Sequence, residues 1–341
     1  MLTERQLLIL HAIVDDYVRS AEPVGSRSVS KREDIPFSPA TIRNEMADLE
    51  ELGFLEKPHS SAGRVPSQQG YRYYVDHMKL PHRLTTVEKA GLSRLASAQL
   101  QATEEVFEAS ARILSEMTSY VSVVLSPETL KEKLCNIQIV PMNDQQAVVI
   151  LVSQTGHVEN RLVHIDEMVT PADLERTVNL LNERLVGTPL LMLQDKITIE
   201  LADLFKRHVG NYQHVMSMLK QLTSRHQPEK MFFSGKTNLM TQPEFQDLGK
   251  IRLVYNTFEE ETRLSQWLRS QQTDGLRVSI GEENELEAFS SCSIVMASYT
   301  VDGYDVGTIG VIGPTRMEYR RMMTVVDVLA QDLSKRLSRL Q

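Results

Sequence analysis

Arg43 and Asn44 are the two neighbouring residues whose side chains are best suited to hydrogen-bonding chemistry with a base pair. Arginine pairs in bidentate fashion with guanine, and asparagine does so with adenine. Both lie in a segment whose apolar residues recur at spacings of three and four, namely Ile42, Met46, Leu49 and Leu52. That spacing predicts an amphipathic helix from Pro39 through Leu52. Ser38 is a suitable N-cap, Pro39 fits the first helical position, and Gly53 suits the C-terminal stop.

The face opposite the apolar stripe carries small residues beside these two polar ones. Ala40, Thr41 and Ala47 are spaced to lie there, with Ser38 at the helix start, and alanine or a threonine methyl can touch a thymine methyl. The C-terminal half instead carries acidic residues, which phosphates repel: Asp48, Glu50 and Glu51. We therefore expect the N-terminal half to enter a major groove. The alternative is an ordinary solvated helix face, which the helix alone does not exclude.

The segments before this helix supply the elements that would position it. Residues 3–19 predict an amphipathic helix capped by Thr3, and residues 23–25 break it. A short helix over residues 26–31 and a turn over 34–37 then lead into the helix of Arg43. Helix, break, short helix, turn and helix is the order of a helix-turn-helix.

A short hairpin follows the helix. Residues 54–57 read as a strand, 58–63 as a tight tip and 64–66 as the returning strand. Such a hairpin is the wing of a winged helix-turn-helix. The expected DNA contacts from the wing and the basic stretch after it are Lys57, His59, Ser60, Arg64 and Arg72.

The run TIRNEMADLEELGFLEKPHSSAGRVPSQQGYRYYVD resembles the signature of the heat-inducible transcription repressor family, HrcA. The chain departs from the usual family wording at four positions, all by mild changes: Pro39, Ser60, Val65 and Ser67. The resemblance implies a homodimer that binds double-stranded DNA at an inverted repeat, the CIRCE operator of GroE- and DnaK-type chaperone operons. It also implies relief of repression on heat shock, with chaperonin as a modulator.

The charge distribution is unusual for a nucleic-acid-binding chain. The formal net charge is −8, yet residues 1–83 are nearly neutral, with 11 Lys/Arg against 12 Asp/Glu. The basic residues of that part gather at 57–83, where Asp76 is the acidic exception. Because non-specific attraction scales with the number of phosphates neutralised, base reading and dimerisation must supply more of the affinity.

Composition argues against several other classes of protein. No apolar run approaches the ~20 residues of a membrane helix, and the N-terminus does not read as a signal peptide, so we expect a cytoplasmic protein without membrane association. Cys135 and Cys292 are interpreted as buried free thiols. The Ser234–Thr237 stretch lacks the upstream glycine of a phosphate loop, since that position is Lys230. We expect no catalytic residues, no metal site, no cofactor and no enzyme activity.

The remainder of the chain reads as mixed helix and strand. Helical patterns cover 85–120, 170–187, about 188–272, and 317–340. The strand-like runs are 134–140, 147–153 and 158–165 before the helical block of 188–272, and 276–280, 292–299 and 308–312 after it. Because strands flank a helical block, the economical reading is an α+β chain in which one antiparallel-sheet domain is interrupted by an insertion.

The resemblance agrees with this reading and implies a GAF-like domain carrying an inserted dimerisation domain. The expected divisions are 1–83 for the winged helix-turn-helix, 84–187 with 273–341 for the GAF-like domain, and 188–272 for the mainly helical dimerisation domain.

One alternative function remains open at this point. A GAF-like domain could bind a small molecule that switches DNA affinity. No convergent charged or aromatic set in the sequence names such a ligand, so a repressor without a small-molecule effector is the preferred hypothesis.

Overall fold

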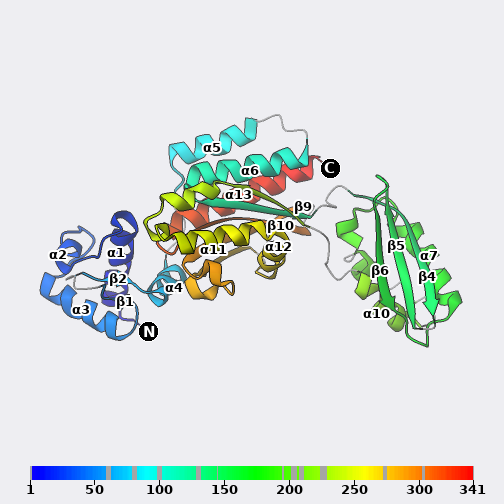
Figure 1. Ribbon diagram of the computed structural model, residues 1–341, viewed down its shortest axis with the longest axis horizontal. Coiled ribbons are helices and arrows are strands. Elements are labelled where there is room, and N and C mark those ends of the chain that lie inside the picture. The colour runs from blue at the N-terminus through cyan, green and yellow to red at the C-terminus, as the bar shows by residue number, and fades with distance from the viewer. Residues whose placement is uncertain are drawn as a thin grey trace. The chain divides into compact units, whose positions relative to one another are not determined.

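The computed structural model divides into two units, each described separately (Figure 1). The first comprises residues 1–125 and 231–340, and the second residues 126–230. The structure describes residues 2–58, 63–78, 83–97, 102–127, 132–143, 145–193, 196–200, 206, 211–222, 229–271, 275–301 and 304–340.

A small helical domain with a two-stranded hairpin opens the first unit. Its elements are α1 (Glu4–Ser20), α2 (Ser26–Val29), α3 (Pro39–Glu51), β1 (Leu55–Glu56), β2 (Val65–Pro66) and α4 (Gln68–His77). Thr3 caps α1 through a capping box with Gln6, as its sequence predicts. The core consists of fully buried aliphatic residues from α1 and α3, which include Ile9, Leu10, Ile13, Ile42 and Leu49. The expected helix-turn-helix and wing order is therefore present.

A five-stranded sheet forms the rest of this unit, with strand order β7-β3-β10-β9-β8. The strands are β3 (Val121–Pro127), β7 (Glu229–Ser234), β8 (Leu276–Ile280), β9 (Cys292–Val301) and β10 (Tyr304–Pro314). The helices around it are α5 (Thr86–Ser97), α6 (Thr103–Thr118), α11 (Leu248–Glu259), α12 (Glu261–Ser270) and α13 (Tyr319–Leu340). Val121 and Val123 pack in one cluster with Phe258 and Trp267 of α11 and α12. The other face lies against α6 and α13, where Phe107 contacts Tyr299.

The second unit contains its own three-stranded antiparallel sheet in the order β4-β5-β6. The strands are β4 (Leu134–Asn143), β5 (Gln146–Ser153) and β6 (Val158–His164). The helices are α7 (Pro171–Leu185) and α10 (Tyr212–Leu222), with shorter helical turns at Leu190–Met192 and Lys196–Glu200. Leu181 of α7 and Val215 of α10 pack in the same core as Val149 of β5.

The domain arrangement differs from the sequence-based expectation, although the mixture of helix and antiparallel sheet agrees with it. The strands over 134–164 do not join those over 276–314, and the second unit spans 126–230 rather than 188–272. Two strands of the larger sheet are absent from the sequence-based expectation: β3 directly follows the expected helix over 85–120, and β7 lies within the expected helical segment 188–272. Strand partnership depends on contacts between distant residues, which local sequence patterns do not encode.

The strands β3 and β7 are sheet neighbours even though the whole second unit separates them in sequence. Asn238, just after β7, donates a hydrogen bond of 3.2 Å to the carbonyl oxygen of Tyr120, just before β3. The end of β7 therefore lies beside the start of β3, so the two strands run in opposite directions. The chain leaves this sheet and returns to it at the same edge.

The two cysteines are both free, but they differ in exposure. Cys292 is buried, as expected, whereas Cys135 is exposed and that part of the prediction is wrong. The alternation along β4 turns Leu134 inward and Cys135 outward.

Candidate nucleic-acid interface

The helix α3 begins at the residues that its sequence marks. The Oγ of Ser38 accepts a hydrogen bond of 3.1 Å from the Thr41 amide, and Pro39 occupies the first turn. Ile42, Met46 and Leu49 are buried. Leu52, which was expected in the same stripe, is 51% exposed because the helix has ended and residue 52 is its C-cap.

The opposite face of α3 is open to solvent in its N-terminal half. The exposed residues on and beside it are Ser38, Ala40, Arg43, Asn44 and Ala47, and Thr41 is half-buried. Positions 40, 43, 44 and 47 are three or four apart, so their side chains share one side of the helix. The structure thus brings the predicted base-reading residues together on one surface.

The wing is anchored to the break between α1 and α2. Strands β1 and β2 pair antiparallel, and Val24 and Arg64 exchange two backbone hydrogen bonds of 2.9 Å. A Cβ on Gly63 would lie 2.7 Å from the Pro23 carbonyl carbon and oxygen, so only glycine fits this close approach. Lys57 is exposed at the end of β1, while His59 and Ser60 lie outside the described residues.

Arg64 contacts α3 as well as forming part of the wing. Its Nη2 lies 2.6 Å from Oε2 of Glu50, and its Nε donates to the same oxygen at 2.7 Å. The Arg64 side chain is 18% exposed. This ion pair fixes the angle between the wing and α3, and the guanidinium is only partly available to a phosphate.

Arg72 lies in a different setting from the one predicted. Its Nε donates to Oε1 of Glu283 at 2.7 Å, and its Nη2 donates to the Val278 carbonyl at 2.8 Å. The hydrogen bond to Glu283 raises the pKa of Arg72 above its usual value. The Oε1 of Gln68 also accepts a hydrogen bond of 2.9 Å from the Glu282 amide. Arg72 therefore links α4 to the five-stranded sheet, and its expected contact with DNA stays a prediction.

Comparison with known proteins decides the family. A family model described as the HrcA protein C-terminal domain matches residues 104–323. The chain is 74% identical to the heat-inducible transcription repressor HrcA of Shouchella clausii over 338 residues, which is 99% of each chain. This chain belongs to the HrcA family of heat-inducible transcription repressors.

A second curated relative agrees with that assignment, and one solved structure is similar in fold. The HrcA repressor of Halalkalibacterium halodurans is 55% identical, covering 99% of this chain and 98% of the relative. A crystal structure described as a hypothetical protein matches over 100% of both chains, with a TM-score of 0.63 and 22% identity. The second likeness concerns the fold alone. The family match, together with these full-length relatives, favours a repressor over a small-molecule sensor.

Arg32, to which no sequence pattern pointed, joins two parts of the helix-turn-helix in this HrcA family member. Arg32 lies 2.8 Å from Asp16 of α1 and 2.9 Å from Asp34 in the turn before α3. The hydrogen bond between Arg32 and Asp34 raises the pKa of the arginine and lowers that of the carboxyl group. The turn that presents α3 is thus fixed to α1. Asp34 is two residues away and could have been noticed, but no local pattern points to Asp16.

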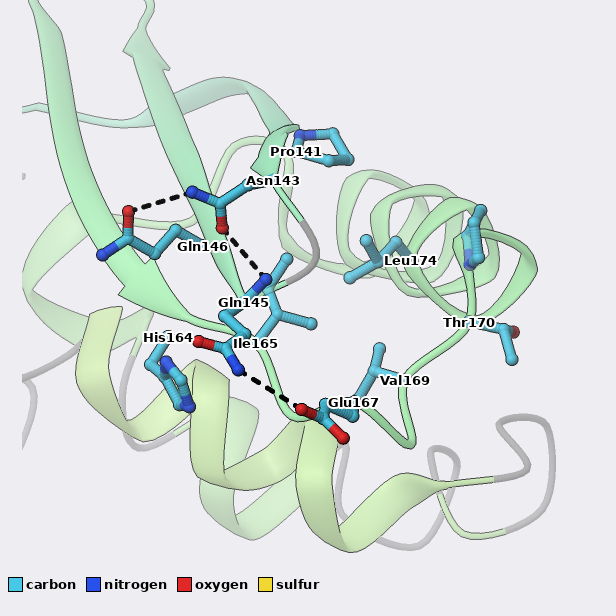
Figure 2. A pocket seen from close by; sticks show the side chains of 11 residues that line it. Pro141, Asn143, Gln145, Gln146, His164, Ile165, Glu167, Val169, Thr170 and Leu174 are labelled. Carbon is cyan, nitrogen blue, oxygen red and sulfur yellow. Dashed lines mark hydrogen bonds between the residues drawn. The ribbon is translucent and has the colours of Figure 1, made fainter.

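The second unit contains a cavity of about 870 Å³ where β4, β5 and the β6–α7 connection meet (Figure 2). Its side-chain amides are linked to neighbouring groups: Asn143 donates to Gln146, and Gln145 donates to Glu167, each at 3.3 Å. Ile165, Val169 and Leu174 supply an apolar floor. The volume would hold a small molecule. Side-chain amides that already have hydrogen-bond partners, together with an apolar floor, do not indicate which class of molecule that would be.

The described part of the chain adds two negative findings. It contains no group of three or more His, Cys, Asp or Glu side chains placed to hold a metal ion. None of its helices combines the length and apolar content required to cross a lipid bilayer.

Proposed function

We propose that this protein represses transcription by placing α3 in the major groove of an inverted-repeat operator, one copy of the chain on each half-site. The observation that carries the proposal is the exposed face of α3, where Arg43 and Asn44 stand among small residues. Small neighbours allow the helix backbone to approach the base edges, and the two polar side chains supply bidentate hydrogen bonds. We expect the wing to lie on the DNA backbone or in the minor groove. This placement is supported by the two strands of the wing, by the Glu50–Arg64 pair and by the exposed Lys57.

Membership of the HrcA family narrows the operator to the CIRCE element of GroE- and DnaK-type chaperone operons. Repression needs no catalytic group, because a repressor bound over a promoter blocks it sterically. We expect the protein to act in the cytoplasm, where those operons lie. Chaperonin is the expected modulator: repression should be strong when chaperonin is free and weak when unfolded protein occupies it.

A homodimer is part of the proposal, because a twofold protein matches an inverted repeat. The outer face of the β4-β5-β6 sheet supports an interface in the second unit. Exposed Val140 and Leu162 flank half-buried Val148 in one register row, and exposed Val158 lies beside Val152 in another. The helices α7 and α10 pack against the other face. We propose a second copy of the chain as the occupant of this apolar surface, because a twofold operator calls for a dimer.

Footprinting on the promoters of the host's chaperone operons tests the operator assignment. Protection of an inverted repeat by the full chain is expected at the growth temperature, with loss after heat shock and recovery when chaperonin is added. The variant Arg43→Ala should lose the footprint, and the exposed Arg263→Ala on α12, whose side chain pairs with Glu260, should keep it. Protection of unrelated promoters to the same extent would refute sequence-specific repression.

Light scattering after size exclusion tests the dimer separately. The variant Leu162→Glu places a charge on the outer sheet face and should shift the protein toward the monomer. The control Val186→Glu changes a valine that is 50% exposed at the end of α7 and should remain dimeric. A dimeric Leu162→Glu protein would place the interface elsewhere.

A further inference from the structure

The helix α4 contacts both the winged domain, formed by α1 to β2, and the sheet domain, formed by the five-stranded sheet and its helices. On its first side, a Cβ at Gly70 would lie 2.1 Å from the Phe54 carbonyl oxygen, and the rings of Tyr73 and Phe54 lie 5.1 Å apart. The Tyr74 hydroxyl donates to Asp15 of α1 at 2.8 Å. Positions 70, 73 and 74 are three or four apart, so one side of α4 packs against the winged domain.

A second side of α4 contacts β8, which lies at one edge of the five-stranded sheet. Arg72 donates to both carboxylate oxygens of Glu283 and to the Val278 carbonyl of β8. Gln68, one helical turn earlier, accepts from the Glu282 amide at 2.9 Å. Two side chains one turn apart therefore attach α4 to β8 and to the turn that follows it.

Tyr71 adds a buried aromatic contact between these polar ones. Its side chain is almost fully buried, and its ring centroid lies 5.8 Å from that of Tyr319 at the start of α13. Tyr319 is itself fixed, because its hydroxyl donates to the Thr315 carbonyl at 2.6 Å and lies 2.7 Å from the hydroxyl of Ser293 in β9. The Tyr71 ring is therefore packed against an immobile partner, and burial of aromatic surface strengthens the attachment of α4 to the sheet domain.

A separate attachment holds the C-terminal part of α1. Arg316, between β10 and α13, donates to the Val18 carbonyl of α1 at 2.7 Å and to Glu244 at 2.6 Å. Glu244 belongs to the short helical turn Pro243–Phe245 of the sheet domain. The Arg316 side chain is only 13% exposed, so these hydrogen bonds are largely shielded from water. The winged domain is thus held through two of its helices, and the two attachments together oppose its rotation on the sheet domain.

We infer that this docking makes the protein selective for the spacing between the two half-sites of its operator, with Glu283 and Arg316 as positioning residues. The inference rests on the proposed function, in which each copy of the chain places one α3 on one half-site. Each base pair added between half-sites moves the second one by about 3.4 Å and rotates it by about 35°. Two copies of α3 that are held at fixed positions therefore fit one spacing, whereas winged domains that rotate freely would fit several.

Weakening the docking should relax this selectivity while α3 continues to read a half-site. Glu283 and Arg316 both belong to the sheet domain, so the double variant Glu283→Ala with Arg316→Ala leaves every candidate DNA contact in place. The matched control, Glu260→Ala with Arg263→Ala, removes an exposed pair of the same two residue types on α12 and its cap. Both double variants should remain dimeric in light scattering, because the proposed dimer interface lies in the second unit.

Fluorescence anisotropy with the full chain tests the inference on three kinds of duplex. These are the inverted repeat protected in the footprint, the same repeat with about half a helical turn (five base pairs) inserted between its halves, and a single half-site. Wild type and control should bind the native spacing about 100-fold more tightly than the lengthened one, since a half-site that cannot be reached adds no avidity. In the double variant this ratio should fall to about ten-fold or less. The ratio is informative because a change at one half-site affects both spacings alike.

An unchanged ratio in the double variant overturns the inference, and so does a wild-type protein that binds both spacings equally. In either case a preference for the half-site over unrelated DNA would leave the proposed repressor function standing. A double variant that is monomeric also overturns the inference, since these residues would then support the dimer. A wild-type protein without any preference for the half-site refutes the proposed function, and the inference with it. If the double variant does not fold, Glu283→Ala alone serves as the test variant, because its side chain is 40% exposed.

Discussion

Arg64 of the wing and Glu50 of α3 form an ion pair in which Nη2 of the arginine and Oε2 of the glutamate lie 2.6 Å apart. The pair joins the two parts of the domain that are expected to contact DNA in different grooves. It also places a carboxylate beside the cation that the sequence assigns to the phosphate backbone. The contribution of Arg64 to binding therefore depends on Glu50.

Single substitutions of Arg64 and of Glu50 should change the non-specific affinity for DNA in opposite directions. Arg64→Ala is expected to weaken binding to every duplex and to reduce the salt dependence by about one charge. Glu50→Gln should strengthen binding and steepen the salt dependence, because it removes a negative charge and releases the guanidinium. Fluorescence anisotropy across a salt series measures both slopes. An unchanged slope in Arg64→Ala would mean that Arg64 acts only as a support for the wing.

Substitution of the α3 residues should instead affect particular base pairs. Arg43→Ala or Asn44→Ala is expected to cost ~1–3 kcal/mol of binding free energy on the cognate operator and to relax specificity at single positions. Binding to a panel of operators with single base-pair changes reveals which position each residue reads. A uniform loss over the whole panel would assign these side chains to the phosphate backbone.

The contact between Arg72 and Glu283 should influence stability more than DNA affinity. Both side chains are partly exposed, at 30% and 40%, so the pair itself is expected to contribute at most about 1 kcal/mol. Each single variant removes one more hydrogen bond: Arg72→Ala the one to the Val278 carbonyl, and Glu283→Ala the one that its Oε2 accepts from the Ile280 amide at 2.9 Å, so the two should cost similar amounts. A double-mutant cycle in urea gives the coupling. A reduced salt slope for operator binding in Arg72→Ala would show that this residue also contacts a DNA phosphate.

Gly70 is required in α4 because the helix crosses close to the main chain before the wing. A Cβ at this position would lie 2.1 Å from the Phe54 carbonyl oxygen. Gly70→Ala should therefore destabilise the protein by ~1–3 kcal/mol, despite the better helix propensity of alanine. Urea denaturation checks this, with Gly249→Ala in α11 as the control, whose new Cβ meets an exposed aspartate side chain. Equal stabilities for both variants would contradict the steric argument.

The two thiols should differ sharply in reactivity. Burial raises the pKa of Cys292 to about 12, so its reactive thiolate is scarce at neutral pH and the sulfur is covered. Cys135 is exposed on β4. A thiol-reactive dye at pH near 8 should therefore label the native protein rapidly at one position, and Cys135→Ser should abolish that phase. Rapid labelling of Cys135→Ser would show that β9 opens readily.

The features that could be predicted from the sequence are those whose contacting residues lie close together along the chain. The Ser38 cap, the buried stripe of α3 and the wing strands depend on neighbours within a few residues, and the structure confirms them. The contact of Arg72 with Glu283 joins residues 211 apart, and the pairing of β3 with β7 spans the second unit. Charge type identified Arg72 as a cation but could not distinguish a carboxylate from a phosphate as its partner. The base-reading role of Arg43 and Asn44 stays a prediction, since their exposure permits it without testing it.

The antiparallel neighbours β3 and β7 make residues 126–230 equivalent to an enlarged hairpin loop. A connection of about two to five residues would close the same pair of strands in an ordinary hairpin. Removing the second unit and joining the strands with such a connection should leave the sheet topology intact. The chain is therefore modular at this edge. The part that is expected to read DNA and the part that is expected to join two copies can diverge in sequence and length independently of each other.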